Sequence, residues 1–318
     1  MRLIYNKIFL EHDTGMHPEN KKRLSCLKEL KETKIKDYSK DIKHIHEKKY
    51  INKVREVSKK GGALDADTFV SKKSYKVAKN AVSATIMASE SKGFALVRPP
   101  GHHSHPDRSS GFCVFNNIAI ATQKLVDKGK KVLIFDFDSH LGDGTEEIFY
   151  ETDKVMYFSI HQYPAFPGKG WVNEIGKGKG KGYTINIPMP EKSGDDLFKD
   201  AINKILPYLK KFNPDIVAIS AGFDGHQDDL LLNLKLSTNS YYFLGKFISE
   251  NFNDYFATLE GGYNIYKLPF CISSFIRGIE GKKNSFVEDK TKSDKKVKKE
   301  YEKRIKLVEK NLSKYWSD

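Results

Sequence analysis

Two aspartates and a histidine follow a short apolar run, Val132 to Phe135, at every second position. Side chains of an extended chain alternate between two faces, so Asp136, Asp138 and His140 would project to the same side. Two carboxylates and an imidazole make up most of a divalent metal site. The spacing therefore predicts metal binding at the end of a buried strand. Helix capping is the alternative interpretation, because aspartate is also common just before a helix.

Other unusual polar residues stand near the ends of apolar runs that are typical of buried strands. They are His102 and His103 after residues 94–97, Asp143 in the same stretch as His140, Asp224 after 216–220, and Tyr263 after 255–259. The carboxyl ends of parallel strands meet at one edge of a sheet, where open α/β proteins form their binding crevices. We therefore expect all these side chains around a single crevice.

Three of these residues would suit a catalytic metal centre. Asp138, His140 and Asp224 would supply three protein ligands and leave one position open for water, as in catalytic zinc sites. Water bound there is acidic enough to form hydroxide near neutral pH. Each motif alone has a simpler explanation in core packing or turn formation. Their number and order favour the catalytic interpretation.

Acid–base groups accompany the predicted ligands. His102 and His103 could take up and return protons if carboxylates orient the two rings, and Asp136 and Asp143 are available for that purpose. Tyr263 follows two glycines, so its backbone can approach a substrate closely and its hydroxyl could stabilise an oxyanion.

Composition indicates a globular protein. The chain has 318 residues, 39% of them hydrophobic, which suits one large α/β domain or two smaller ones. Cys26, Cys113 and Cys271 lie far apart, which argues against a disulfide framework and against a cysteine zinc site. The N-terminus lacks a signal-peptide pattern, and no apolar run approaches the roughly 18 residues that span a membrane. We expect a soluble cytoplasmic protein without a membrane partner.

The formal net charge of +14 raises nucleic acid as a partner. The last 38 residues hold 13 Lys and Arg against 7 Asp and Glu, and many other lysines are spread along the N-terminal segment. Because no recognition-helix or RRM pattern focuses this charge, we expect no specific nucleic-acid binding.

The order of elements predicts the fold class. Strands are expected at 1–10, 94–97, 132–138, 155–160, 183–188, 215–220 and 255–259, and helices from about 19 to 30 and at 46–60, 74–92, 116–127, 144–151, 195–212 and 241–250. Alternating strands and helices indicate an α/β protein with a doubly wound, mostly parallel sheet and helices on both faces. We expect one domain over residues 1–318, with a flexible lysine-rich segment at 281–300. Residues 301–318 should form a helix that packs back, because Tyr301, Ile305, Val308 and Leu312 recur at helical spacing.

Taken in order, the motifs resemble those of the zinc-dependent histone deacetylase and acetylpolyamine amidohydrolase superfamily, which has the arginase-like α/β fold. The matching stretches run nearly from end to end: Asp13 to Gly15, His17 to Glu19, Leu64 to Thr68, Arg98 to His103, Gly111 to Cys113, Asp136 to Gly144, Pro164 to Gly168, Ala221 to Asp224 and Glu260 to Asn264. The resemblance implies amide hydrolysis that releases acetate from an acetylated amine.

The resemblance also implies a role for each site residue. The ligands of a single catalytic zinc ion, with iron(II) as the alternative metal, would be Asp138, His140 and Asp224. The orienting pairs would be His102 with Asp136 and His103 with Asp143, and His103 would act as general base and acid. Tyr263 would polarise the acetyl carbonyl. A structural potassium ion beneath the zinc would involve Asp136, Asp138, His140 and Ser159.

The substrate channel follows from the same comparison of motifs. Phe112, next to Gly111, and Phe166 match the two aromatics that flank the acyl-lysine channel. Asp65 matches the loop carboxylate that holds the substrate backbone, although a turn-forming role suits it nearly as well. The chain departs from the family at Leu141, where a second histidine is frequent, and at residues 228–230, where the family usually has Asp-Pro.

The predicted substrate is an acetylated lysine side chain in a peptide or protein, or a small acetylated amine. Polyamine-selective relatives carry a glutamate seven positions after the third metal ligand, and this chain has Leu231 there. Lysines of the loop 162–182 would repel a polycation if they lie at the rim; these are Lys169, Lys177, Lys179 and Lys181. Acetylpolyamine hydrolysis is the alternative, and a binuclear ureohydrolase or a non-enzymatic basic DNA-binding protein are the other classes. The sequence leaves the oligomeric state open.

Overall fold

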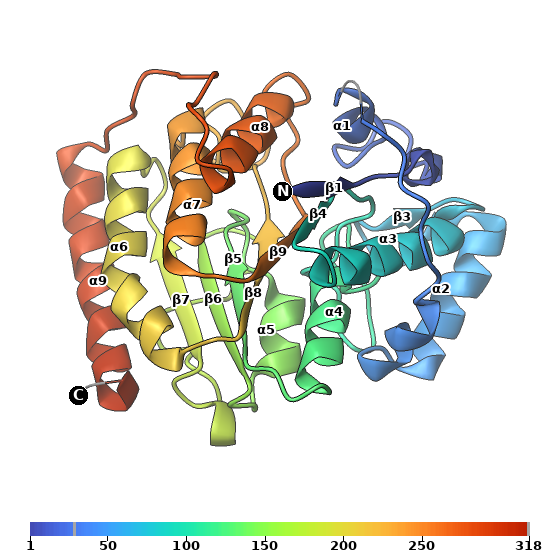
Figure 1. The fold of residues 1–318 in the computed structure, drawn as a ribbon, viewed down its shortest axis with the longest axis horizontal. Helices are drawn as coiled ribbons and strands as arrows, with labels where there is room; N and C mark the ends of the chain where they lie inside the picture. Colours follow the sequence, from blue (N-terminus) through green and yellow to red (C-terminus); the bar gives the residue numbers. More distant parts are fainter. Residues whose placement is uncertain (28–29, 317–318) are drawn as a thin grey trace.

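A parallel sheet forms the centre of the protein (Figure 1). The computed structural model describes residues 1–27 and 30–316, and within them this sheet has seven strands in the order β1-β4-β9-β8-β5-β6-β7. The strands are β1 (Arg2–Ile4), β4 (Gly93–Ala95), β5 (Val132–Asp136), β6 (Val155–Gln162), β7 (Thr184–Met189), β8 (Ile216–Ala221) and β9 (Tyr255–Leu259). All neighbours run parallel, and a separate antiparallel pair joins β2 (Gly62–Ala63) to β3 (Phe69–Val70). The predicted α/β class with a parallel sheet is confirmed.

Helices cover the sheet in two groups. One group consists of α3 (Ser74–Ser89), α4 (Asn117–Val126) and α5 (Asp143–Phe149), and the other of α6 (Asp195–Phe212), α7 (Thr238–Asn251), α8 (Leu268–Ile279) and α9 (Lys295–Trp316). Figure 1 shows α6, α7 and α9 running side by side, with α3 and α4 near the other edge of the sheet. The shorter elements are α1 (Lys22–Ser25), α2 (Lys48–Lys60) and the 3-10 turns η1 (Lys7–Glu11), η2 (Ser39–His44) and η3 (Gly178–Gly180).

The central strand β5 explains the position of the predicted site. Its five residues are all buried, as expected for a parallel strand with helices on both faces. The strand expected over 132–138 ends at Asp136, because the Asp138 N–H bonds the Asp136 carboxylate at 3.1 Å and turns the chain out of the ladder. The polar residues after Asp136 therefore lie in a loop at the carboxyl edge of the sheet.

Several predicted boundaries were wrong. The strand expected over residues 1–10 covers only β1, because the Asn6 side chain accepts the Ile8 N–H and begins the turn η1. The helix expected up to about residue 30 ends at Ser25, and residues 28–29 lie outside the described part of the chain. Helix α8 was not predicted, although apolar residues at helical spacing bury one of its faces against α7.

The C-terminal helix begins earlier than expected, at Lys295, where the Asp294 carboxylate accepts the Val297 N–H at 2.9 Å. Its buried positions are Val297, Tyr301, Ile305, Val308 and Leu312, and it packs on α6 and on the edge strand β7. The preceding segment bonds to the start of α6 through Thr291 and Ser293. The flexibility of 281–300 and the domain limits 1–318 stay predictions.

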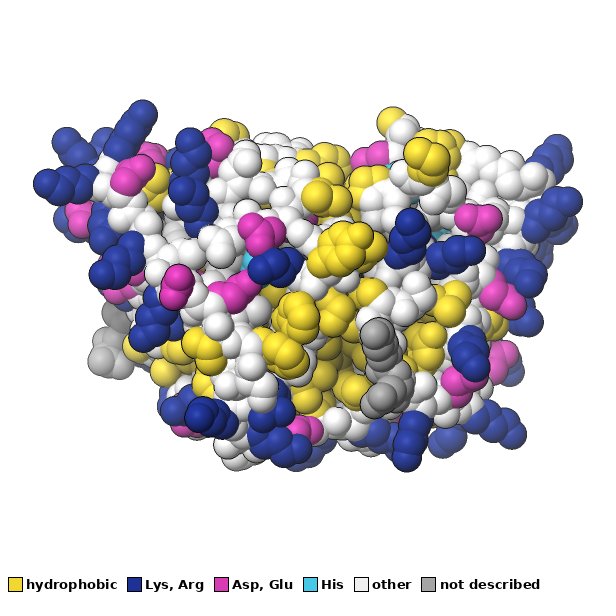
Figure 2. All heavy atoms as spheres, turned by 90° about the horizontal axis from the view of Figure 1, so that it is seen from above, with side chains coloured by type: hydrophobic (Ala, Val, Ile, Leu, Met, Phe, Trp, Pro, Cys, Tyr) yellow, Lys and Arg dark blue, Asp and Glu magenta, His cyan; other side chains and the backbone are white. Residues whose placement is uncertain are grey.

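The surface carries many separated charges. Figure 2 shows lysines and arginines distributed around one face of the molecule and interspersed with acidic side chains, with apolar side chains gathered near its middle. No helix in the described part of the chain is long and apolar enough to cross a membrane. The expectation of no specific nucleic-acid binding stays a prediction.

Candidate active site

Asp138, His140 and Asp224 meet at the carboxyl edge of the sheet. One potential ligand atom from each lies within 4.8 Å of those of the other two, and all three side chains are buried. The His140 Nδ1 lies 2.6 Å from Asp224 Oδ2 and 3.3 Å from Asp138 Oδ1. We call these residues the triad. The structure therefore brings Asp138 and His140 next to Asp224, which is far away in the sequence, as predicted.

The charges of the triad fit a cation. Burial acts to lower the pKa of His140, yet the carboxylates of Asp224 and Asp138 raise it to about 10. Burial acts to raise the pKa of Asp138, yet the charges of His102 and His140 hold this pKa well below its usual range. Ligand groups bind metals in their deprotonated form, so a metal ion held here would displace the proton of His140 and neutralise the two carboxylates in its place.

Glycines make room for the triad. A Cβ at Gly222 would lie 2.1 Å from Asp138 Oδ2, and one at Gly261 would lie 2.5 Å from the same oxygen. The Gly261 N–H also donates to this oxygen at 2.8 Å, and the Ser139 N–H donates to Asp224 Oδ1 at 2.8 Å. The backbone thus holds both carboxylates, and the donor set of one histidine and two carboxylates suits a zinc or iron(II) ion.

His102 and Asp136 form the inner histidine pair. The His102 Nδ1 lies 3.1 Å from Asp136 Oδ2, and this oxygen also accepts the Tyr157 hydroxyl at 3.1 Å. Burial opposes the charge of His102, but Asp138 and Asp136 raise its pKa well above 6.5. Ser159 lies beside Asp136 in the neighbouring strand, so the residues predicted to hold potassium are close together, and that role stays a prediction.

His103 and Asp143 form the outer histidine pair. The His103 Nδ1 lies 2.8 Å from Asp143 Oδ1, and the two histidine rings are 4.1 Å apart. Burial and the charge of His102 lower the pKa of His103 to about 4, against the pull of Asp143. A neutral imidazole with an orienting carboxylate is a suitable proton acceptor.

Tyr263 lies near the triad, since the charges of Asp138 and Asp224 act on its hydroxyl. Its backbone N–H donates to Asp229 Oδ2 at 2.7 Å, and that oxygen also accepts the Asn264 N–H at 3.1 Å. Burial raises the pKa of Tyr263 well above 10, so its hydroxyl keeps its proton and can donate a hydrogen bond. Burial and the nearby Asp224 also raise the pKa of Asp229 to about 6. Asp229 therefore holds the backbone of the tyrosine loop, a role that sequence reasoning missed.

Phe112 and Phe166, the two aromatics predicted to flank the channel, lie beside Tyr263 and His103, and the channel role stays a prediction. The Phe112 ring lies 5.7 Å from Tyr263, and the Phe166 ring lies 5.1 Å from His103. Gly111 has φ +53, and a Cβ on it would lie 2.3 Å from His103 Cδ2. Only glycine therefore fits between this turn and the His103 ring.

Asp65 and Leu231, the other two residues predicted to contact the substrate, both lie in loops. Asp65 Oδ1 accepts the N–H groups of Asp67 and Thr68 at 3.0 and 2.8 Å, and its other oxygen accepts the Ser109 hydroxyl. These bonds form a turn, which is the alternative that the sequence left open. Leu231 is 38% exposed. Substrate contact by either residue stays a prediction.

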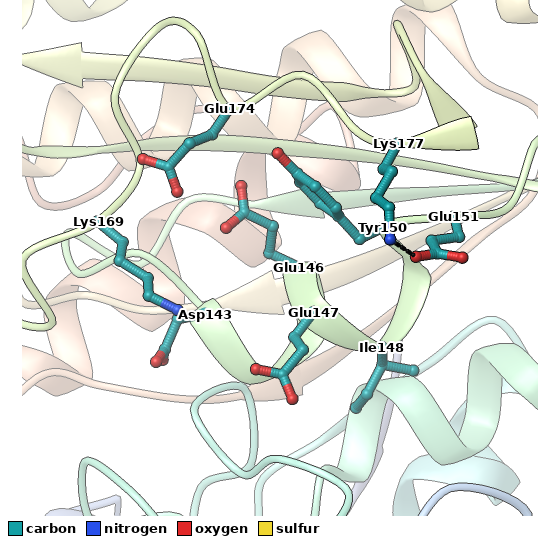
Figure 3. A pocket seen from close by; sticks show the side chains of 9 residues that line it. All are labelled: Asp143, Glu146, Glu147, Ile148, Tyr150, Glu151, Lys169, Glu174 and Lys177. Carbon is teal, nitrogen blue, oxygen red and sulfur yellow. Dashed lines mark hydrogen bonds and ion pairs between the residues drawn. The ribbon is translucent and has the colours of Figure 1, made fainter. Parts of the chain in front are cut away.

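A separate cleft of about 610 Å³ lies beside the outer pair (Figure 3). Asp143, Glu146 and Glu147 line it from α5, and Lys169 and Glu174 line it from the loop after β6. Burial and the neighbouring Glu174 and Asp143 raise the pKa of Glu146 to about 8, although its hydrogen bond with Asn186 opposes this. Two of the four lysines expected at the rim, Lys169 and Lys177, line this acidic cleft, and Lys177 pairs with Glu151 at 2.8 Å.

Glu260 is a further residue that sequence reasoning missed. It is fully buried, and its Oε2 accepts the N–H groups of Gly101 and His102 at 2.7 and 3.2 Å. Burial raises its pKa to about 7, against the charge of His102. This carboxylate ties the histidine loop to the tyrosine loop. An acidic residue at the end of an apolar strand is the pattern that could have indicated it.

Comparison with known proteins decides the family. Residues 17–279 match the family description "Histone deacetylase domain". The chain belongs to the histone deacetylase family. A "Probable deacetylase" of Archaeoglobus fulgidus is 35% identical over 308 residues, which cover 88% of this chain and 86% of the relative. "Histone deacetylase 14, chloroplastic" of Arabidopsis thaliana is 41% identical over 197 residues, which cover 59% of this chain and 47% of the relative.

A solved structure agrees with this assignment. The "Crystal Structure of HDA15 HD domain" superposes with a TM-score of 0.89 at 26% identity and covers 99% of this chain and 97% of that chain. The protein is thus a hydrolase of the deacetylase class. The predicted enzyme class is confirmed, and the alternative of a non-enzymatic basic protein is set aside.

Proposed function

We propose that this deacetylase is a zinc-dependent amidohydrolase that removes acetyl or related acyl groups from lysine side chains of peptides or proteins, or from a small acetylated amine, and releases acetate. The placement of the outer histidine pair and Tyr263 close to the triad carries the proposal. Asp138, His140 and Asp224 would hold the ion, which when bound supplies Lewis acidity and an acidic water.

The protein's own groups account for the proton transfers. His103, neutral because burial lowers its pKa to about 4, accepts a proton from the attacking water while Asp143 orients its ring. The Tyr263 hydroxyl donates a hydrogen bond to the carbonyl oxygen as negative charge develops there. His103 then returns its proton to the nitrogen of the departing amine, and the carbon–nitrogen bond breaks to leave acetate and the free amine.

The rim beside Tyr263 supports an acyl-lysine peptide over a polyamine. A hollow of about 550 Å³ is lined there by Met16, Leu230 and Tyr266 together with other apolar and polar side chains. Lys22 lines it as well, and none of its lining residues is acidic. A polycation gains nothing from such a surface, whereas apolar side chains that flank an acetyl-lysine could bury area against it.

Acetylpolyamine hydrolysis remains the second candidate, because the cleft in Figure 3 carries Glu146, Glu147, Glu151 and Glu174. A polyamine chain that reached this cleft from the crevice would find acidic partners. A binuclear ureohydrolase would require two catalytic metal ions for each chain. Metal stoichiometry distinguishes this class from the single ion that we propose.

A fluorogenic acetyl-lysine peptide assay tests the proposal. We expect turnover that a chelator abolishes, that zinc restores and that a hydroxamate inhibits. The variant Tyr263→Phe should lose about 100- to 1,000-fold in kcat, because it removes one oxyanion donor. Parallel titration with acetylspermidine and acetylputrescine decides the substrate class. A large preference for the acetylpolyamines would overturn the choice of acyl-lysine.

A further inference from the structure

His105 is a third buried histidine in the loop of His102 and His103, and the proposed chemistry leaves it unused. Its side chain is 2% exposed. The His105 Nε2 lies 3.0 Å from Asp143 Oδ2, and its Nδ1 lies 2.9 Å from Glu147 Oε2. The guanidinium of Arg108 approaches the same Nδ1 at 2.9 Å. His105 therefore bridges the carboxylate of the outer pair to charged groups at the surface.

Asp143 is held from two sides as a result. Its Oδ1 binds the His103 ring at 2.8 Å, and its Oδ2 binds the His105 ring at 3.0 Å. In the inner pair, the equivalent second contact to Asp136 comes from the Tyr157 hydroxyl at 3.1 Å. Each orienting carboxylate thus contacts the histidine of its pair and one further buried side chain.

The outer pair needs this second contact more than the inner pair does. Asp136 is completely buried, whereas Asp143 is 6% exposed and lines the cleft of Figure 3, which is open to solvent. A carboxylate beside water has competing hydrogen-bond donors and can rotate. Asp143 and Glu147 stand four residues apart on α5, so they face the same side of the helix and His105 spans the gap between them.

We propose that His105 is a positioning residue of the deacetylation reaction, which holds Asp143 in the orientation that directs the His103 ring toward the crevice. Glu147, which also accepts a hydrogen bond from Arg108 at 3.2 Å, fixes His105 in turn. The inference rests on the proposed function, since it assigns His103 the proton transfers. It goes beyond that function in extending the outer pair into a chain of four side chains, His103–Asp143–His105–Glu147, that ends at the surface.

Substitutions of His105 test the proposal. His105→Phe removes both contacts and should lower kcat about 10- to 100-fold with KM unchanged, because small misplacements of a catalytic group cost that much. His105→Gln keeps a donor for Asp143 and should retain kcat within about threefold. If His105 acts through Asp143, then His105→Phe should cost less than about twofold further in an Asp143→Asn background.

Glu147→Ala removes the last of the four linked side chains. This position is half-exposed, so the fold tolerates the change, and kcat should fall about 3- to 10-fold. Its matched control is Glu151→Ala, since Glu151 lies on the same cleft but contacts only Lys177 among the residues drawn in Figure 3. Activity of the control should equal that of the wild type. Glu147→Ala keeps the test decisive if His105→Phe does not fold.

A second readout does not depend on turnover. In protein labelled with 15N-histidine, the His103 Nδ1–H signal, assigned by its loss in His103→Gln, should persist in His105→Gln and broaden by exchange with water in His105→Phe. An unchanged signal and kcat in His105→Phe or Glu147→Ala would overturn the proposal, as would an equal loss in the Asp143→Asn background. A wild-type protein without deacetylase activity would instead contradict the proposed function, so the two failures are distinguishable.

Discussion

The inner and outer histidine pairs are built from the same chemical groups but differ in charge. The ring-to-carboxylate distances are 3.1 Å for His102 with Asp136 and 2.8 Å for His103 with Asp143. Burial disfavours the charged form of both rings. The pKa of His102 is nevertheless raised well above 6.5 by Asp138 and Asp136, whereas burial and the charge of His102 lower the pKa of His103 to about 4.

The difference shows that position, not pairing, decides the role of each ring. His102 Nε2 faces the triad, with Asp138 Oδ1 at 3.9 Å, and therefore gains from more than one carboxylate. His103 stands beside a charged histidine and has a single carboxylate in contact. One ring is thus suited to hold a positive charge and the other to accept a proton. A divalent ion held by the triad would add positive charge and lower the pKa of both rings.

Removal of Asp138 should cause the largest loss of activity, because this carboxylate serves both the triad and His102. Asp138→Ala takes away a metal ligand and the carboxylate that raises the pKa of His102. We expect kcat to fall by about 1,000-fold or more and bound zinc to fall well below one ion per chain. Assay and metal analysis check this, with Asp153→Ala, a partly exposed position that pairs only with Lys154 in the structure described, as control. Full metal content and activity in Asp138→Ala would contradict the assignment of the triad.

Substitution of each histidine separately should show which ring transfers the proton. We expect His103→Gln to lower kcat/KM about 100- to 10,000-fold, the usual contribution of a general acid–base group. His102→Gln should lower kcat/KM about tenfold less than His103→Gln does, because the contribution of His102 is mainly electrostatic. Both variants need to be compared at equal zinc content. A larger loss in His102→Gln would reverse the assigned roles.

Gly111→Ala should disturb the outer ring without touching the inner pair. The added Cβ would lie 2.3 Å from His103 Cδ2, and we expect kcat to fall about 10- to 100-fold. Gly129→Ala is the matched control: its φ of +80 imposes similar backbone strain, but no atom lies within 4 Å of the added Cβ. Comparable activity loss in both variants would show that strain, and not contact with His103, is responsible.

Burial of a histidine without a carboxylate partner should change stability and not kcat, and it can be tested outside the site. His46 contacts the His105 carbonyl and the Asn116 N–H at 2.9 Å each, and burial lowers its pKa to about 4. Below pH 6.5 the unfolded chain binds a proton at this residue that the folded chain does not. The free energy of unfolding should therefore fall by about 3 kcal/mol as the pH drops from about 6.5 to about 4, and this is the whole contribution of His46.

Chemical unfolding across this pH range measures the contribution. His46→Gln should flatten the pH dependence, whereas the exposed His44→Gln should leave it as in the wild type. An identical slope in all three proteins would show that His46 takes up its proton in the folded state.

Local patterns predicted much of the fold and the set of residues that meet in the crevice. Apolar runs such as 132–135 and the polar residues after them depend on neighbours in the chain, so the alternation of strands and helices could be predicted. The boundaries of β5, α1 and α9 could not, because they depend on single contacts such as that between Asp138 and Asp136. Helix α8 was missed since its apolar face matters only when α7 is beside it.

By itself, the sequence determined which chemical groups this deacetylase carries and that strand ends would gather them, because side-chain type and periodicity are local properties. The tertiary structure decided the opposite pKa shifts of His102 and His103, the support of Tyr263 by Asp229, and the contact of His105 with Asp143 and Glu147. Each depends on burial and on distances between segments far apart in the chain. Electrostatic energies vary steeply with both, so no spacing of residues along the sequence could have specified them.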